Sequence, residues 1–387
     1  MKLGNVATGE HFYNRTADLN DIWQVLADNH LILSGPRRLG KTSILYKLIE
    51  QADKHGYQAQ IVDVQGIDSA QGFINSLKKQ YASLKANKAS LIDKFNPFKS
   101  IKAFGVAIEV KDSQQPSWQE EGDYVFNQLA ADKLLILVDE FSIFLETLLQ
   151  RNYDEAVDFL AWLRRWRIAQ NLQCKFIFTG SIGLQALLEK HGLVAEMNDC
   201  FDYILGPFKT KHAVAMLQQF ATQNSYLLDD NNAKMLCDKI GWLSPFFINL
   251  LLNESINAAR DRLEETVEPL ASEIIGQDIE DGYERLLVSR SRFSHWESRL
   301  KKQLPATELS FCMTILTDIS KSDDGLSLSQ LSSRLQKKQV DVEVREQLIQ
   351  KLRLKLTDEG YLSSPDEQGK IHFLSFLLKD YWKRNHG

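Results

Sequence analysis

The stretch LILSGPRRLGKTSIL, residues 31–45, determines how the rest of this chain is interpreted. Residues 35–42 match the pattern G-x-x-x-x-G-K-[ST] at every specified position. The apolar run before them is typical of a buried strand, and apolar residues recur at helical spacing after them. Because a strand, a loop and a helix in this order form the setting in which the pattern holds phosphate, the sequence predicts a nucleotide-binding loop.

The residue types of this loop suit phosphate chemistry. Glycines let the backbone curl so that N–H groups point inward, and the helix N-terminus that follows adds unpaired donors and positive partial charge. Lys41 is expected to reach the β- and γ-phosphates of ATP, and Thr42 to bind Mg²⁺ through its hydroxyl. Arg37 and Arg38 are candidates for sensing phosphate or a partner domain, with surface exposure as the alternative. The predicted nucleotide-binding residues of the loop are Gly35, Pro36, Arg37, Arg38, Leu39, Gly40, Lys41, Thr42 and Ser43.

A second motif, KLLILVDEF at residues 133–141, supplies the acids that such a site requires. Its apolar run is typical of a parallel strand covered on both faces, and Asp139 and Glu140 follow directly. Asp139 is predicted to hold Mg²⁺ through its water shell. Glu140 is predicted to orient and deprotonate the attacking water as a general base. An adjacent pair of acids after such a strand is typical of hydrolysing ATPases rather than of nucleotide kinases.

A third apolar strand lies in KFIFTGSIGL, residues 175–184, and ends in Thr179, Gly180 and Ser181. A polar side chain at this strand tip is expected to lie between the γ-phosphate and the water, and we assign this catalytic role to Ser181 or Thr179. The alternative is that the hydroxyl caps the helix that follows, because serine is a preferred N-cap residue.

The composition is that of an ordinary globular protein. The chain has 387 residues, 44% of them hydrophobic, and its net charge of −5 gives no global sign of a nucleic-acid partner. The four cysteines are scattered without a C-x-x-C pair, which argues against a zinc site or a disulfide framework. No apolar signal core begins the sequence and no apolar run is long enough to span a membrane, so we expect a cytoplasmic protein.

The pattern along the chain predicts three parts. Strands and helices alternate in residues 1–207, which predicts a three-layer α/β domain with a parallel sheet. A purely helical pattern then predicts a lid over residues 208–302. Ahead of the first helix, Tyr13 and Arg15 are candidates to fold over the adenine, with core packing as the alternative for the aromatic residues there. Residues 91–120 form a less regular insertion, for which a hairpin or edge strand is expected and no role is assigned.

Residues 303–387 have the pattern of a winged-helix domain, with three helices followed by a hairpin. From residue 290 onward there are 17 Lys and Arg against 13 Asp and Glu, a charge of about +4. The third helix, residues 342–357, carries Lys351, Arg353 and Lys355 and is a candidate DNA-reading face. Because the charge is modest and acids begin this helix, contact with a protein or an autoinhibitory role is the alternative.

Three arginines, Arg164, Arg165 and Arg167, lie close together in the predicted helix 153–170. One of them is a candidate trigger arginine that reaches the γ-phosphate on a neighbouring subunit. The alternative is a solvated basic face whose side-chain stems pack on the tryptophans.

With these motifs placed, the chain resembles the archaeal-type ATPases, a branch of the AAA+-like and STAND P-loop ATPases. The resemblance rests on the segments HFYNRTADL, GPRRLGKTSIL, LLILVDEF and FTGSIGL, and it covers roughly residues 10–255. It implies ATP and Mg²⁺ binding by the first motif and hydrolysis by the second, through Gly35, Gly40, Lys41, Thr42, Asp139 and Glu140.

Members of this family often have a Gly-x-Pro at the start of a lid helix, whose proline reaches the adenine. Here Pro245 is present in IGWLSPFF and is the candidate adenine contact, but Leu243 stands where the first glycine is expected. No clear arginine follows to act as a second sensor, which fits STAND-like members that work as switches.

The leading hypothesis is therefore a Mg²⁺-dependent ATPase that acts as a switch. The ATP and ADP states would differ in how the winged-helix domain packs, and this domain would couple to a partner protein or to a second copy. The alternative is a DNA-binding oligomeric ATPase, such as a loader, a mobile-element factor or a defence factor.

Overall fold

The structure is a computed structural model that describes residues 6–84, 116–130, 132–180, 183–264 and 272–387. The prediction for Ser181 and most of the predicted insertion at residues 91–120 lie outside the described residues.

By backbone contacts the chain divides into two compact units. The first, here called the sheet unit, comprises Val6–Gly35 and Lys41–Leu205. The second, the helical unit, comprises Pro36–Gly40 and Gly206–Gly387. The five residues at the tip of the glycine-containing loop thus group with the C-terminal half of the chain.

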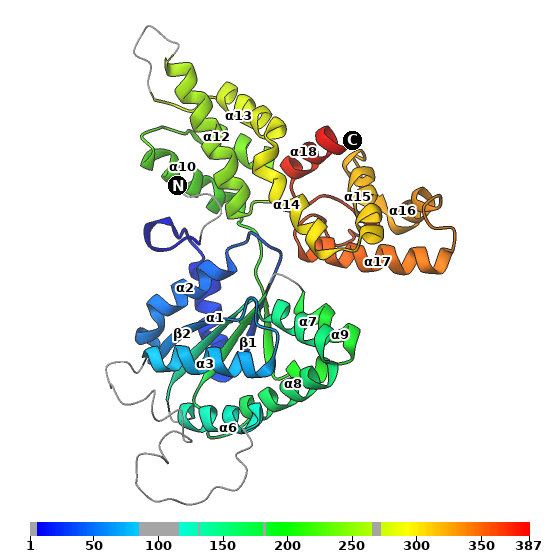
Figure 1. Cartoon of the computed structure of the whole chain (residues 1–387). Coiled ribbons are helices and arrows are strands. Elements are labelled where there is room, and N and C mark those ends of the chain that lie inside the picture. Colours follow the sequence, from blue (N-terminus) through cyan, green and yellow to red (C-terminus); the bar gives the residue numbers. More distant parts are fainter. Residues whose placement is uncertain (1–5, 85–115, 131, 181–182, 265–271) are drawn as a thin grey trace, which may run out of the picture. The chain divides into compact units, whose positions relative to one another are not determined.

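Five parallel strands form the centre of the sheet unit (Figure 1). Their order across the sheet is β2-β3-β4-β1-β5. The three middle strands are almost entirely buried, as expected for strands covered on both faces. The edge strand β5 instead leaves Phe201 and Ile204 exposed. This sheet confirms the predicted α/β class. The strands are β1 (His30–Ser34), β2 (Gln58–Asp63), β3 (Leu134–Asp139), β4 (Lys175–Thr179) and β5 (Cys200–Ile204).

Seven helices surround the sheet in the described part of this unit. One of them shows how local sequence starts a helix, because Ser117 and Glu120 form a capping box in which each side chain binds the other residue's backbone N–H. The helices are α1 (Thr16–Asp28), α2 (Lys41–Ala52), α3 (Ala70–Leu84), α6 (Trp118–Leu129), α7 (Phe141–Arg151), α8 (Tyr153–Arg167) and α9 (Leu184–His191).

The core on one face of the sheet is rich in aromatic residues. Alternate strand residues such as Ile136 and Phe176 point into it, because successive side chains of a strand face opposite sides. The ring of Phe159 lies 5.0 Å from that of Phe73 and 5.3 Å from that of Phe144, both with edge-to-face geometry. Such pairs contribute about 0.5–1.5 kcal/mol each beyond the burial of their area. This packing fixes α3, α7 and α8 against the sheet.

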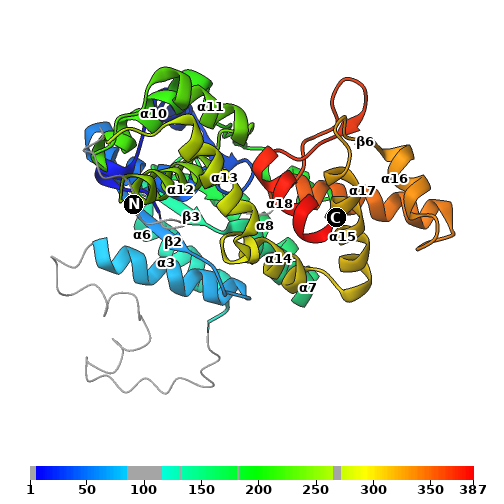
Figure 2. The same cartoon turned by 90° about the horizontal axis from the view of Figure 1, so that it is seen from above.

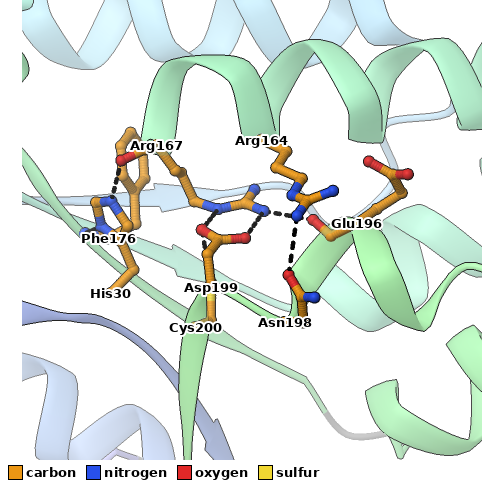
Figure 3. Close-up of polar contacts among 8 residues, drawn as sticks. All are labelled: His30, Arg164, Arg167, Phe176, Glu196, Asn198, Asp199 and Cys200. Carbon is orange, nitrogen blue, oxygen red and sulfur yellow. Dashed lines mark hydrogen bonds and ion pairs between the residues drawn. The ribbon is translucent and has the colours of Figure 1, made fainter. Parts of the chain in front are cut away.

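A buried polar network ties together the beginnings of β1, β4 and β5 (Figure 3). Arg167, the last residue of α8, binds Asp199 at two points, with Nε 2.7 Å from Oδ2 and Nη2 2.8 Å from Oδ1. His30 Nδ1 accepts a hydrogen bond from the Phe176 N–H at 3.1 Å. Its Nε2 therefore carries the proton, which is donated to the carbonyl oxygen of Arg167 at 3.0 Å.

The electrostatics of this network follow from its burial. Burial lowers the pKa of His30 to about 4, so the imidazole is neutral near pH 7. Burial raises the pKa of Asp199, but the hydrogen bonds from Arg167 outweigh this and leave it below its ordinary value. The two-point pair is therefore charged, and removing one partner would leave an uncompensated buried charge.

The same network corrects the interpretation of the three arginines of α8. The Arg167 side chain is fully buried, so it belongs neither to a solvated basic face nor to a surface that reaches a neighbouring subunit. Arg165 is 61% exposed and pairs with Asp123, whose carboxylate also accepts from the indole of Trp166. Arg164 donates to Asn198 at 3.2 Å (Figure 3). The periodicity of α8 could not show which arginine faces the start of β5.

The described part of the helical unit consists of packed helices and one short two-stranded β-sheet (Figures 1 and 2). α12 and α13 pack side by side, and a Cβ added at Gly282 would lie 2.7 Å from the backbone N of Ser255, so only glycine permits this approach. The helices are α10 (Thr210–Gln223), α11 (Asp230–Ile240), α12 (Pro245–Glu264), α13 (Gly276–Val288), α14 (Arg290–Gln303), α15 (Ala306–Ser320), α16 (Leu328–Leu335), α17 (Val342–Asp358) and α18 (Phe376–His386).

The last 85 residues contain α15, α16 and α17 at the positions where three helices were predicted. β6 (Leu326–Ser327) pairs antiparallel with β7 (Lys370–Ile371). A further antiparallel bridge joins Leu362 to Phe373 around the turn at residues 366–369, as the predicted hairpin requires. Trp382 of α18 and Tyr361 are almost fully buried in the core of this region.

Candidate nucleotide-binding site

The loop between β1 and α2 has the backbone that its glycines predict. Gly35 and Gly40 have φ values of +129° and +93°, in the region that favours glycine. A Cβ added at Gly35 would also lie 2.7 Å from the carbonyl oxygen of Leu205. Both glycines are therefore required for the chain to turn here. We call residues 35–40 the glycine loop.

Lys41, the first residue of α2, lies back over the loop. Its Nζ donates to the carbonyl oxygen of Gly35 at 2.6 Å, and only 9% of the residue is exposed. The ammonium group therefore lies beside the residue that opens the loop. A cation held here, next to a helix N-terminus, creates a local site for an anion.

Asp139 and Thr42 meet at the tips of β3 and α2. Thr42 Oγ1 donates to Asp139 Oδ2 at 3.1 Å, although 97 residues separate them in sequence. The carboxyl ends of parallel strands lie at the same edge of a sheet, which brings the two residues together. A carboxylate beside a hydroxyl gives hard oxygen ligands of the kind that Mg²⁺ prefers.

Glu140 directly follows Asp139 and begins the turn into α7. Its φ of +59° places the backbone in the left-handed region, where residues other than glycine are uncommon. Its side chain does not cap the helix. This conformation is typical of positions held by their surroundings at functional sites.

At the tip of β4 the structure describes Thr179 but not Ser181. Thr179 is 3% exposed, and its Oγ1 donates to Asp139 Oδ1 at 2.5 Å. Gly180 follows, and an added Cβ there would lie 1.9 Å from Oγ of the buried Ser142 in α7. The sequence placed Thr179 at the strand tip but gave no sign of its partner or of the contact with Ser142.

The residues before α1 contact the beginning of α2. The Ala7 N–H donates to Ser43 Oγ at 2.9 Å, and Lys47 Nζ lies 5.7 Å from the ring centre of Phe12. Burial lowers the pKa of Arg15, whose guanidinium pairs with Asp18 at 3.3 Å. Burial also raises the pKa of Tyr13. The start of this segment thus lies against the first turns of α2, and Arg15 is part of a partly buried ion pair.

The loop tip makes its contacts within the helical unit. Arg37 Nη1 lies 3.8 Å from Glu359 Oε2, and the Arg38 guanidinium lies 4.4 Å from the ring centre of Phe246, next to Pro245. Burial lowers the pKa of Arg38 to about 10, and the charges of Arg37 and of Arg299 add to this effect. Both side chains are only partly exposed and have partners, which argues against the alternative of simple surface exposure.

Glu359 is the centre of this contact. Only 2% of its side chain is exposed, and its carboxylate also accepts from Arg299 Nε at 2.6 Å and from Gln303 Nε2 at 3.1 Å. A carboxylate buried to this extent is stabilised only by such partners. No pattern in the sequence connects Glu359 with a loop more than three hundred residues away.

Two further features of the described residues concern metal ligands and membrane spans. Among the described residues no group of three or more His, Cys, Asp or Glu side chains could hold a metal ion. No helix in the described ranges is long and apolar enough to cross a membrane.

Comparisons with known proteins identify the fold. No protein-family model and no curated protein matches the chain. A Walker-type ATPase of Pyrococcus abyssi superposes with a TM-score of 0.64 and 14% identity over 99% of this chain and 99% of that chain. The ORC1 protein of Aeropyrum pernix, solved in complex with DNA, reaches a TM-score of 0.43 and 15% identity over 97% of this chain and 94% of that chain.

The first of these likenesses extends over nearly the whole chain, including the five-stranded parallel sheet. The chain therefore has the fold of this Walker-type ATPase. The likeness to ORC1 is too distant to add to this conclusion.

Proposed function

We propose that this chain binds ATP with Mg²⁺ at the glycine loop and hydrolyses it. The observation that carries the proposal is the convergence of Lys41, Thr42, Asp139 and Glu140 at one edge of the parallel sheet. The sequence pattern and the fold agree with it, because a curled glycine loop leading into a helix N-terminus is a phosphate-binding arrangement.

Each residue has a distinct role in this proposal. Lys41 stabilises negative charge on the phosphates, and the N–H groups of the glycine loop orient them. Thr42 and Asp139 would hold Mg²⁺, which when bound supplies neutralisation of phosphate charge. Glu140 accepts a proton from the attacking water. Tyr13, Pro245 and a hydroxyl after β4, such as that of Ser181, remain candidates for contacts with the adenine and the water.

We further propose that hydrolysis drives a switch rather than a continuous motor. The contact between Arg37 and Glu359 supports this, because it links a residue of the glycine loop to the end of α17 in the C-terminal region. A ligand shifts a conformational equilibrium only through different contacts in its two states. Phosphate bound near Arg37 would compete with Glu359 and so change the packing of the proposed winged-helix domain, residues 303–387.

The surface of α17 supports a protein partner over DNA. Of its candidate DNA-reading residues, Lys351 pairs with Glu308 at 2.6 Å and Arg353 with Gln350 at 3.2 Å. At and just before its start, Val340, Val342 and Val344 are 79%, 56% and 47% exposed. Exposed apolar side chains at one end of a helix whose cations are partly paired suit a protein contact better than a phosphate backbone.

Phosphate release by the purified full chain, with and without duplex DNA, tests this ranking. We expect a slow basal rate that duplex DNA leaves unchanged and that Glu140→Gln abolishes. A large DNA-dependent rise that is lost in the Gln variant would instead favour the DNA-binding oligomeric ATPase. Lys41→Ala serves as the control for contaminating activity, because it removes the ammonium group of the loop.

A further inference from the structure

Two threonines from different elements donate to the two oxygens of one carboxylate. Thr42 Oγ1 reaches Asp139 Oδ2 at 3.1 Å, and Thr179 Oγ1 reaches Asp139 Oδ1 at 2.5 Å. Asp139 ends β3 and Thr179 ends β4, which are neighbouring strands with Val138 paired to Phe178. The register of the two strands therefore places Thr179 directly beside Asp139.

The two sides of this carboxylate differ. Oδ1 accepts from Thr179 and from the N–H of Glu140 at 3.0 Å, whereas Oδ2 accepts from Thr42. Two donors on Oδ1 fix the rotation of the carboxylate. Oδ2 is then held toward Thr42, the residue that would share the metal with it.

The direction of the Thr179 hydrogen bond limits what its hydroxyl can do. A threonine hydroxyl has a single proton to donate. Since Thr179 gives this proton to Asp139, it cannot donate to a phosphate oxygen while the bond is made. The residue is 3% exposed, so its side chain has little room to turn toward another partner.

The backbone after Thr179 is fixed as well. A Cβ at Gly180 would lie 1.9 Å from Ser142 Oγ and 2.6 Å from Ser142 Cβ, so the chain passes directly against the first turn of α7. This helix begins immediately after Glu140. The end of β4 is thus held between Asp139 and the helix that follows the proposed general base.

We infer that Thr179 is a positioning residue that orients Asp139 toward Thr42 and the metal, and that it is not the polar residue that contacts the γ-phosphate. The inference rests on the proposed function. It leaves the phosphate contact at this strand tip to another group, and it makes the metal affinity of the site depend on a hydroxyl that need not touch the metal.

The test compares Thr179→Val, which removes the hydroxyl at nearly constant shape, with Thr179→Ser, which keeps it. Mn²⁺ binding is measured by electron paramagnetic resonance on the full chain with a non-hydrolysable ATP analogue. Binding of a fluorescent ATP analogue is measured in parallel in EDTA. Thr147→Val is the matched control, because its hydroxyl donates to the carbonyl oxygen of Ile143 within its own helix, α7.

We expect Thr179→Val to weaken Mn²⁺ binding by about tenfold or more, the usual effect of removing a residue that orients a metal ligand. Thr179→Ser and Thr147→Val should stay near the wild type, and nucleotide binding in EDTA should be unchanged in all variants. A general loss of folding would also weaken nucleotide binding in EDTA. The EDTA measurement therefore separates the loss of metal-ligand orientation from misfolding of the variant.

Two results would overturn the inference in distinguishable ways. If the wild-type chain binds Mn²⁺ and nucleotide but Thr179→Val binds Mn²⁺ equally well, the inference fails and the proposed function stands. If the wild-type chain binds no nucleotide either with Mn²⁺ or in EDTA, the inference and the proposed function fail together.

Discussion

Glu359, which follows the last residue of α17, lies 3.8 Å from Arg37 of the glycine loop with only 2% of its side chain exposed. Arg299 binds the same carboxylate at 2.6 Å. An acidic residue of the C-terminal region therefore pairs with an arginine of the glycine loop, the loop that the sequence predicts to bind phosphate. In the proposed switch, Glu359 would compete with the phosphates of the nucleotide for Arg37.

The Glu359→Gln variant should bind ATP more tightly than the wild type. Without the charge of Glu359, Arg37 is released toward phosphate oxygens, and we expect about a fivefold gain in affinity, within the usual range of coupling energies. Fluorescent ATP titration measures it, with Glu367→Gln, the neutralisation of an exposed acid in the nearby hairpin, as the control. Equal or weaker ATP binding by Glu359→Gln would contradict the competition.

The Gly180→Ala variant should be destabilised, because its methyl group would overlap Ser142. Overpacking of this kind costs about 1–3 kcal/mol. Adding Ser142→Gly removes both overlapping atoms and should restore much of the melting temperature, measured by circular dichroism. Gly206→Ala is the matched control, since a Cβ there meets nothing within 4 Å. A failure of the second substitution to restore stability would show that the close contact is not the cause.

Stability should fall as the pH is lowered from 6.5 toward 4, in part through His30. Its folded-state pKa is about 4 and its ordinary value is 6.5. As pH falls, the unfolded chain therefore takes up the proton first and is favoured. At pH 5 the resulting loss in the free energy of unfolding is about 2 kcal/mol, from 1.36 kcal/mol per pKa unit.

The His30→Gln variant tests this assignment, because glutamine cannot titrate in this range. Urea unfolding at pH 7 and pH 5 should show a smaller loss of stability in the variant than in the wild type. His295, whose pKa burial and the charges of Arg38 and Arg37 lower to about 4, should keep its own share of the dependence in both proteins. An equal loss in the two proteins would exclude His30 as a source.

Local patterns were sufficient for much of the fold. The continuous apolar run before Gly35 predicted β1, because a strand buried on both faces has apolar residues throughout. The helical spacing of apolar residues after Lys41 predicted α2, because a helix buried on one stripe repeats them every three to four residues. The meeting of Thr42 with Asp139 also followed, since parallel strands end at one edge of the sheet.

Contacts that depend on register or on distant segments could not be predicted. Thr179 reaches Asp139 only because β3 and β4 pair as they do, and Arg167 is buried only because α8 ends beside Asp199. Glu359 meets Arg37 without any shared local pattern. In each case the deciding information is tertiary, and the residue types alone fit an exposed position equally well.

The most direct measurement is ATP binding and phosphate release by the wild type and Glu140→Gln on matched preparations. If Glu140 is the general base of an ATPase, the Gln variant binds Mg²⁺-ATP with an affinity close to that of the wild type. Its phosphate release should fall by about a hundredfold or more. Unchanged phosphate release in Glu140→Gln, or no ATP binding by either protein, would contradict the account.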